Sequence, residues 1–429
     1  MAKNVFVLGL TDLQRKELET LQYADWCEFH DLIGYDRLVA ADELRFADLL
    51  EQGRRELDAF DGSVDAVVAH WDFPTSVLAP ILAAEHGIPA PSLRSVVTCE
   101  HKYWSRLEQR ASVPDHVPDF AAFDPFADDV LEQIGLPFPF WVKPIKSFSS
   151  QLGFRIDDED DLARAVAALR EGVHEVGDAF DEVLAMLDLP PEVADVAGTD
   201  CLAEGIITGR QTAPEGSVAR GRFSVHGVFD MHLDERGESI VALDYPASRI
   251  PERVQDQMAD VSERFLRHVG FDDGCFNVEF LWDEPTDSLK IIEVNTRISQ
   301  SHSDLFAKVD RVSNHQIAVD VALGAEPSLP DGAGTYAVAA KCIILEREDG
   351  VVTRVPSEDE LAELQRRFPE TVFQIDVEPG DRLADLAHQD TYNYGLGDVY
   401  VGADSREDLE RRRQEILSSL RFELDRDVA

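Results

Sequence analysis

Two short segments place acidic and amide side chains on one face of neighbouring predicted strands. In FNVEF, Asn277 and Glu279 alternate with apolar residues. In the later segment IIEVNTR, Glu293, Asn295 and Arg297 alternate in the same way. Alternate residues of a strand share a face, so each strand presents a polar row opposite an apolar one. If the strands pair as a hairpin, the two glutamates converge in a half-buried place, where carboxylates need a cation.

These side chains have the chemistry of a divalent metal site. The oxygen atoms of Glu279, Glu293 and Asn295 are the hard ligands that Mg²⁺ prefers, with Mn²⁺ as the alternative ion. Arg297 is one step further along the strand, where a guanidinium could bind a carboxylate or a phosphate. Two simpler interpretations stay open: the polar face could be ordinary solvated surface, or Arg297 could pair only with Glu293.

Lysine is scarce, with eight lysines among 40 basic residues, so each one is informative. Lys143 lies between apolar residues and a proline, which is an unusual place for a solvated charge. Lys146 follows in a polar loop that ends at Gly153, and a lysine beside such a loop can bind phosphates through ammonium, backbone and hydroxyl donors. Lys102 begins another predicted helix, where the alternative is a surface residue. The loop carries three hydroxyl side chains, Ser147, Ser149 and Ser150.

The composition indicates a globular, acidic protein. The 429 residues include 84 acidic and 40 basic ones, which gives a formal net charge of −44. This field disfavours nucleic acid and anionic membranes as partners. Because the acids are spread along the chain, we interpret them as a halophilic surface, screened over about 3 Å at 1 M salt. No apolar run approaches membrane-spanning length, and five scattered cysteines indicate free thiols, so we expect a cytoplasmic protein.

Strands and helices alternate along the first 100 residues, which predicts an α/β fold with an open, mostly parallel N-terminal sheet. Asp72 ends one of these strands, where such sheets place ligand crevices. A small α/β unit is predicted at the C-terminal end. We expect four regions: 1–110, the N-terminal α/β domain; 111–205, a small subdomain with a mobile insertion near 171–199; 206–328, a larger subdomain with the metal site; and 329–429, the C-terminal domain.

The order of these segments resembles the ATP-grasp superfamily, in its carboxylate–amine ligase and biotin-carboxylase-like branch. The resemblance rests on EHKYWSRLEQR, WVKPIKSFSSQLGF, LAEGIITGRQ, NVEFLWD and EVNTR, and it implies an ATP-grasp fold with ATP and Mg²⁺ as cofactors. Gln211 and Thr296 depart from the family, which often has an acidic ribose contact and a proline there. The implied ATP-binding residues are Lys102, Lys143, Lys146, Ser147, Ser149, Ser150, Glu204, Gly205, Ile206 and Gln211. The implied metal ligands are Glu279, Glu293 and Asn295, and the implied catalytic residues are Arg297 and Lys143.

The resemblance implies an ATP-dependent carboxylate–amine ligase that forms an acyl-phosphate and releases ADP and phosphate. Its partners would be a small carboxylic acid, such as an amino acid, and an amine, and a homodimer is the default assembly. One rival is a biotin-carboxylase-like enzyme that makes carboxyphosphate with a separate biotin carrier. Another is an ATP-binding sensor without turnover. We expect four further side chains to contact substrate: Arg249, Arg222, Ser299 and His302.

Overall fold

The computed structural model describes residues 2–39, 44–147, 151–237, 239–330, 332–386 and 389–426. Its N-terminal part is a three-stranded sheet in the order β2-β1-β3, in which both pairings are parallel, as the sequence predicts. Helix α1 begins after Thr11, whose hydroxyl forms a capping box with Gln14. The elements of this part are β1 (Lys3–Leu8), α1 (Asp12–Glu19), η1 (Ala24–Trp26), β2 (Cys27–Leu32), α2 (Tyr35–Leu38), α3 (Phe46–Ala59), β3 (Ala66–Val68), α4 (Thr75–Glu85), α5 (Leu93–Glu100), α6 (Lys102–Ser112) and η2 (Pro114–His116).

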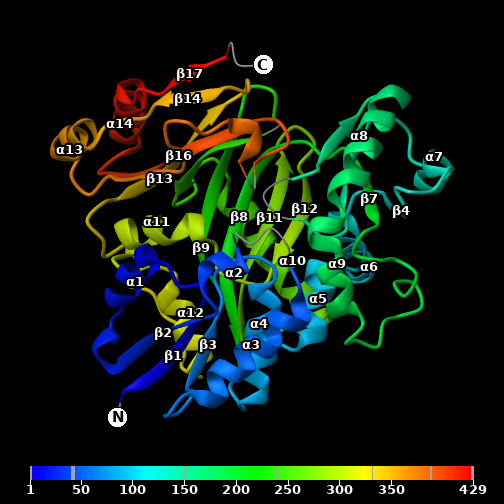
Figure 1. Cartoon of the computed structure of the whole chain (residues 1–429), viewed down its shortest axis with the longest axis horizontal. Helices are drawn as coiled ribbons and strands as arrows, with labels where there is room; N and C mark the ends of the chain where they lie inside the picture. The colour runs from blue at the N-terminus through cyan, green and yellow to red at the C-terminus, as the bar shows by residue number, and fades with distance from the viewer. Residues whose placement is uncertain are drawn as a thin grey trace.

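A second, four-stranded sheet has the order β4-β7-β5-β6 and is antiparallel throughout. Figure 1 shows it at one side of the molecule, together with α7 and α8. The segment 171–199, predicted as a mobile insertion, contains a packed helix in which Phe180 is fully buried against Phe73. The elements are β4 (Phe120–Phe123), α7 (Val130–Ile134), β5 (Phe140–Pro144), β6 (Phe154–Ile156), α8 (Glu159–Gly172), α9 (His174–Leu184) and β7 (Cys201–Gly205).

The largest sheet has eight strands in the order β12-β11-β8-β9-β10-β13-β16-β15, and every neighbouring pair is antiparallel. It runs through the middle of the molecule (Figure 1). Strand β13 pairs with β10, so this sheet continues across the domain boundary predicted at residue 328. Its strands are β8 (Arg210–Ala219), β9 (Arg222–Leu233), β10 (Ile240–Tyr245), β11 (Gly274–Asp283), β12 (Ser288–Asn295), β13 (Val338–Glu346), β15 (Val372–Ile375) and β16 (Tyr394–Ala403).

The remaining elements cover this sheet and extend its C-terminal end. Two helices lie between residues 300 and 322, separated by Arg311, whose backbone φ of 74° is left-handed and ends the first helix. These elements are α10 (Glu252–His268), α11 (Gln300–Asp310), α12 (His315–Ala322), β14 (Val351–Arg354), α13 (Glu358–Arg367), η3 (Leu383–Asp385), α14 (Arg406–Ser419) and β17 (Glu423–Asp425).

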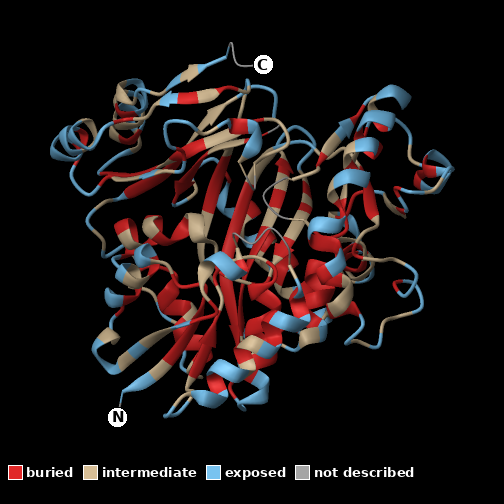
Figure 2. Cartoon of the chain, in the orientation of Figure 1, coloured by how far each residue is buried: buried red, intermediate tan, exposed pale blue. Residues whose placement is uncertain are grey.

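The core explains why one face of the β11–β12 hairpin is free for chemistry. Phe276, Val278 and Phe280 are all fully buried and belong to the same apolar cluster as Phe265 and Met258 of α10. Figure 2 shows that the central strands are largely buried, that α13 is mostly exposed, and that α14 mixes exposed and intermediate residues. Because α10 fixes the apolar face, the alternate polar residues must point the other way. No helix in the described ranges is long and apolar enough to cross a membrane.

Candidate active site

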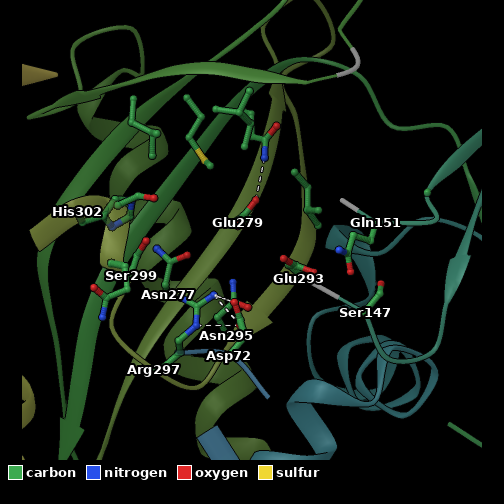
Figure 3. A pocket seen from close by; sticks show the side chains of 18 of the residues that line it. Asp72, Ser147, Gln151, Asn277, Glu279, Glu293, Asn295, Arg297, Ser299 and His302 are labelled. Carbon is green, nitrogen blue, oxygen red and sulfur yellow. Dashed lines mark hydrogen bonds and ion pairs between the residues drawn. The ribbon is translucent and has the colours of Figure 1, made fainter. Parts of the chain in front are cut away.

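A large cavity of about 1330 Å³ opens where the three sheets meet. Its wall includes residues from the end of the parallel sheet, from β5 and β7 of the four-stranded sheet, and from the polar face of β11 and β12. Figure 3 shows Asp72, from the end of the parallel sheet, and the side chains of Glu279, Glu293 and Asn295 around one space. Residues that the sequence analysis selected from distant parts of the chain therefore line a single cavity.

The predicted hairpin of polar strands is confirmed. Glu279 lies directly opposite Glu293, and Asn277 lies opposite Asn295, with a β-bulge just after Glu279. Burial and the facing carboxylate of Glu293 raise the pKa of Glu279 to about 8. A neutral hydrogen bond of 2.8 Å from Gln211 Nε2 to Glu279 Oε2 offsets only part of this cost (Figure 3). The solvated-surface interpretation is wrong, because this face lines the cavity.

The carboxylate pair fits a divalent cation. Within the described residues, neither Glu279 nor Glu293 forms an ion pair with a lysine or arginine, and the nearby charge of Arg297 offsets only part of the cost of burying Glu279. No group of three or more His, Cys, Asp or Glu side chains in that part of the chain could hold a metal by itself. The predicted third ligand is the amide of Asn295, which adds an uncharged oxygen to the two carboxylates. Two carboxylates and an amide suit Mg²⁺, which keeps several non-protein ligands.

Arg297 is paired with an aspartate that is 225 residues away in sequence. Its Nε donates to Asp72 Oδ1 at 2.9 Å, and its Nη2 donates to Asp72 Oδ2 at 2.8 Å. Figure 3 shows this two-pronged contact beside Asn295. The alternative that Arg297 merely pairs with Glu293 is wrong. The planar guanidinium holds a carboxylate in the geometry that a substrate carboxylate would use.

Lys143 and Lys102 approach the cavity from the opposite wall. Lys143 Nζ is 2.7 Å from Glu204 Oε2, and Arg106 contacts the other carboxylate oxygen of Glu204. The two cations hold the pKa of the buried Glu204 at about 2. Lys102 Nζ donates to the carbonyl oxygen of Ser147 at 3.0 Å, and burial lowers the pKa of Lys102 to about 7. A phosphate beside Lys102 would favour its charged form.

Lys146 is held differently from the other two lysines. Its ammonium is buried and lies 2.8 Å from Glu100 Oε2, while Thr296 donates to Glu100 Oε1 at 2.9 Å. Phe73 and Phe180 lie near the same ammonium, with ring centroids 5.6 and 5.8 Å away. Lys146 lines the cavity, yet its charge is compensated by Glu100, and Glu100 in turn joins the end of α5 to Thr296 at the end of the hairpin.

Two predicted substrate residues, Ser299 and His302, share a partner that sequence reasoning missed. Glu215 is fully buried, and it accepts hydrogen bonds from the Ser299 backbone N–H at 2.9 Å and from Asn314 Nδ2 at 2.7 Å. His302 Nδ1 is 2.7 Å from the same carboxylate, and its ring stacks on Phe229 at 3.5 Å. The network fixes the start of α11 under the cavity. The available signal was a single acidic residue in the middle of the β8 segment RQTAPEGSVA.

The other predicted residues divide into those at the cavity and those outside it. Gly205, Ile206 and Gln211 line it. Arg222 forms a surface ion pair with Glu326, and Arg249 Nη1 is 2.9 Å from His232 Nδ1. Neither arginine lines the cavity, so neither is placed to contact a substrate there. Ser149 and Ser150 lie outside the described residues.

Lys341 is a cavity residue that the sequence analysis did not select. Its ammonium lies 2.8 Å from Asp398 Oδ2 and donates to Ser301 Oγ at 3.0 Å. The carboxylate of Asp398 and the ring of Tyr400 raise the pKa of Lys341 above its usual value in spite of burial. The scarcity of lysine could have indicated it.

Part of the chain, including the polar hairpin, is similar to one known protein family. Residues 228–326 match the model of the carbamoyl-phosphate synthase L chain, ATP-binding domain. Carbamoyl phosphate synthase large chains from Methanobrevibacter smithii and Paenarthrobacter aurescens are 35% identical over 88 residues, which is 20% of this chain. The chain matches only 8% of the length of these relatives.

Solved structures resemble the whole chain. The L-amino acid ligase from Bacillus licheniformis has a TM-score of 0.69 with 16% identity, covering 99% of both chains. Carboxyaminoimidazole ribonucleotide synthase from Aspergillus clavatus, solved with ATP, has a TM-score of 0.67 with 14% identity, covering 97% of this chain and 98% of that one. Phosphoribosylglycinamide synthetase from Anaerococcus prevotii has a TM-score of 0.63 with 13% identity, covering 99% and 100%. At these identities the likeness establishes the fold.

Proposed function

This chain has the ATP-grasp fold, and from that premise we propose that it is an ATP- and magnesium-dependent ligase that joins a small carboxylic acid to an amine. The observation that carries the proposal is the cavity wall, where a carboxylate pair, two lysines and a carboxylate-binding arginine face one space. Phosphoryl transfer depends mainly on positioning and charge neutralisation, and these side chains supply both.

The nucleotide would lie between the four-stranded sheet and the hairpin. Lys143 and Lys102 would bind its phosphates, and the chain at Gly205 and Ile206 would border its base. Glu279, Glu293 and Asn295 would hold Mg²⁺, which, when bound, neutralises phosphate charge. The ion pair with Glu204 holds the ammonium of Lys143 at the cavity wall, so little side-chain reordering is needed when Lys143 binds a phosphate.

Arg297 would bind the acid substrate. Its partner in the structure is the carboxylate of Asp72, which it holds by two hydrogen bonds. We expect the substrate carboxylate to be held in the same way. A carboxylate oxygen of the acid attacks the γ-phosphorus, the bond to the β-phosphate oxygen breaks, and ADP leaves. The amine nitrogen then forms a bond to the acyl carbon, inorganic phosphate leaves, and the nitrogen loses one proton to give the amide.

The class of acid follows from the size and polarity of the cavity. It has room for a nucleotide and a second small molecule, and its far wall carries Lys341, Asp398 and Ser301 beside Arg297. Paired opposite charges suit a substrate that carries both, and an amino acid is such a substrate. The L-amino acid ligase from B. licheniformis has the same fold and supports this choice.

The test is a hydroxamate assay, in which hydroxylamine replaces the amine and captures an acyl-phosphate. Pools of amino acids and other carboxylic acids are incubated with ATP, Mg²⁺, hydroxylamine and molar KCl. We expect one pool to give hydroxamate together with stoichiometric ADP. Lys143→Met and Glu293→Gln should lower the rate at least 100-fold, whereas the exposed-site controls Lys16→Met and Glu192→Gln should keep it.

Two results would contradict the proposal. ADP release that depends on bicarbonate and gives no hydroxamate with any organic acid would instead indicate carboxyphosphate formation. ATP binding without ADP release in any pool would indicate a sensor.

A further inference from the structure

The end of the cavity nearest the N-terminal sheet contains buried polar atoms that have no partner. His70 follows β3, lines the cavity and is only 1% exposed, and neither of its ring nitrogens forms a hydrogen bond within the described residues. Glu17 of α1 also lines the cavity, and its Oε2 is buried without a hydrogen bond. His315 of α12 lies behind them, with its Nε2 unpartnered in the described structure. Buried polar groups normally have partners, so four such atoms in one place call for an explanation.

The three side chains form one cluster. The ring centroids of His70 and His315 are 5.2 Å apart, and Glu17 Oε2 is 3.5 Å from His315 Nδ1, in an orientation that gives no hydrogen bond. Figure 1 shows α1 beside α12, and Glu17 belongs to α1 and His315 to α12. Because the three residues come from three separate elements, the packing of the domain brings the unpartnered atoms together.

The cluster offers acceptors and an acidic group. Burial, with His315 beside it, holds the pKa of His70 well below its usual value, and burial lowers the pKa of His315 to about 4. Each imidazole is therefore neutral at pH 7 and keeps one acceptor nitrogen. Burial and the nearby Asp304 of α11 raise the pKa of Glu17 to about 8, in spite of Lys308 from the same helix. A ligand that donates several hydrogen bonds would satisfy these atoms, and a positively charged ligand would also favour the ionised form of Glu17.

We propose that this end of the cavity is an ammonium-binding subsite, in which Glu17 and His70 receive the ammonium group of the amine substrate. The proposal rests on the proposed ligase function, because it assigns a place to the second reactant. A primary ammonium has three donors and one positive charge, which matches the acceptors of Glu17 and His70 and the carboxylate charge of Glu17.

The subsite is joined directly to the acid-binding arginine. Gln300 lies three residues after Arg297, and its Nε2 donates to the His70 carbonyl oxygen at 3.1 Å. Gln14 of α1 donates to Gln300 Oε1 at 3.0 Å. Asp72, which holds Arg297, is two residues after His70. Glu17, His70 and Arg297 line the same cavity, so an amine bound at Glu17 and His70 would share it with the acid substrate. Its ammonium would give one proton to Glu17 before the neutral nitrogen attacks the acyl carbon, and the nitrogen would lose a second proton as phosphate leaves.

Equilibrium binding tests the subsite in the full chain without turnover. Glycinamide carries an ammonium but no carboxylate, so it cannot use Arg297, and propionamide is its uncharged counterpart of similar shape. We expect glycinamide to bind wild type at least tenfold more tightly than propionamide in calorimetric titrations at pH 7. Binding should also release about 0.9 proton, because a Glu17 with a pKa of about 8 is mostly protonated at pH 7 before the cation arrives.

Glu17→Gln should abolish both the preference and the proton release, whereas Glu19→Gln, an exposed position on the same helix, should keep both. Equal affinity of wild type for the two amides, no glycinamide binding, or an unchanged preference in Glu17→Gln would overturn the proposal. If that variant does not fold, the wild-type comparison of the two amides still decides.

A kinetic measurement separates this proposal from the ligase assignment. Hydroxylamine is uncharged at pH 7, so the ratio of kcat/KM for glycinamide to that for hydroxylamine reports the ammonium site. With the acid found in the hydroxamate assay, Glu17→Gln should lower this ratio at least tenfold and Glu19→Gln should not change it. An unchanged ratio with normal hydroxamate formation refutes the subsite alone, whereas absent hydroxamate formation refutes the ligase while the binding titration still tests the subsite.

Discussion

Replacing Glu279 by glutamine should stabilise the metal-free protein at alkaline pH while removing its proposed activity. Glu279 faces Glu293 in a half-buried position, and burial and that carboxylate raise its pKa from 4.5 to about 8. Such a group binds its proton more tightly in the folded state than in the unfolded state. Its contribution is therefore harmless below pH 4.5, becomes increasingly destabilising between pH 4.5 and 8, and is constant above pH 8.

The expected size follows from the shift. Each pKa unit corresponds to about 1.4 kcal/mol, so 3.5 units give about 5 kcal/mol as the upper limit of the penalty above pH 8. Glutamine has the same shape, and its side-chain oxygen still accepts the hydrogen bond from Gln211. The substitution should therefore remove the charge penalty without opening a void.

The assay is urea unfolding of wild type and Glu279→Gln in EDTA and molar KCl at pH 5 and pH 8.5. We expect nearly equal free energies of unfolding at pH 5, and a variant that is 3–5 kcal/mol more stable at pH 8.5 by the same linkage. Glu192→Gln, at an exposed position, controls for the general loss of one negative charge. A variant that is less stable at both pH values, or a difference that does not change with pH, would refute the argument that the carboxylates face each other uncompensated.

Three further outcomes are expected. Mg²⁺ should raise the unfolding free energy of wild type more at pH 8.5 than at pH 5, and should have little effect on Glu279→Gln. Urea titration in MgCl₂ at a near-saturating concentration on the order of 10 mM measures this effect. An equal effect on both proteins would contradict the metal site. Asp72→Asn should lower the KM for the acid about tenfold in the hydroxamate assay, because the substrate no longer competes with a charged partner for Arg297; an increased KM would mean that Asp72 positions Arg297 instead. Arg106→Gln should cost about 3–5 kcal/mol at pH 7, because it leaves Glu204 buried with one cation. Since the pKa of Glu204 is about 2 in the folded state, this contribution is present above pH 4.5 and is lost as the pH falls toward 2, which acid titration of both proteins can follow.

The part of the site that could be predicted from sequence is local. Alternation of apolar and polar residues in two adjacent segments predicted that Glu279 and Glu293 share a face, and the hairpin register places them opposite each other. The same reasoning predicted the parallel N-terminal sheet, which the structure confirms. Both depend on strand periodicity, which the chain encodes within a few residues.

Two features of the structure have local causes that the pattern of apolar and polar residues does not show. The break between α11 and α12 occurs at Arg311, a non-glycine residue in a left-handed conformation. Residues other than glycine rarely adopt such a conformation, so an arginine at this position does not indicate a helix end. Arg222 and Arg249 were predicted to contact substrate. In the structure both lie at the surface, where Arg222 contacts Glu326 and Arg249 contacts His232.

The sequence by itself determined which residues form the polar face of the hairpin, the fold class, and the set of basic residues available for phosphates, because periodicity and residue type are properties of short segments. Only the tertiary structure decided how these groups are paired. Asp72 holds Arg297 across 225 residues, and Arg106 and Lys143 share Glu204. Ion pairs of this kind depend on how three sheets approach one another, and this approach is set by the burial of apolar faces over the whole chain, so no short segment contains the information.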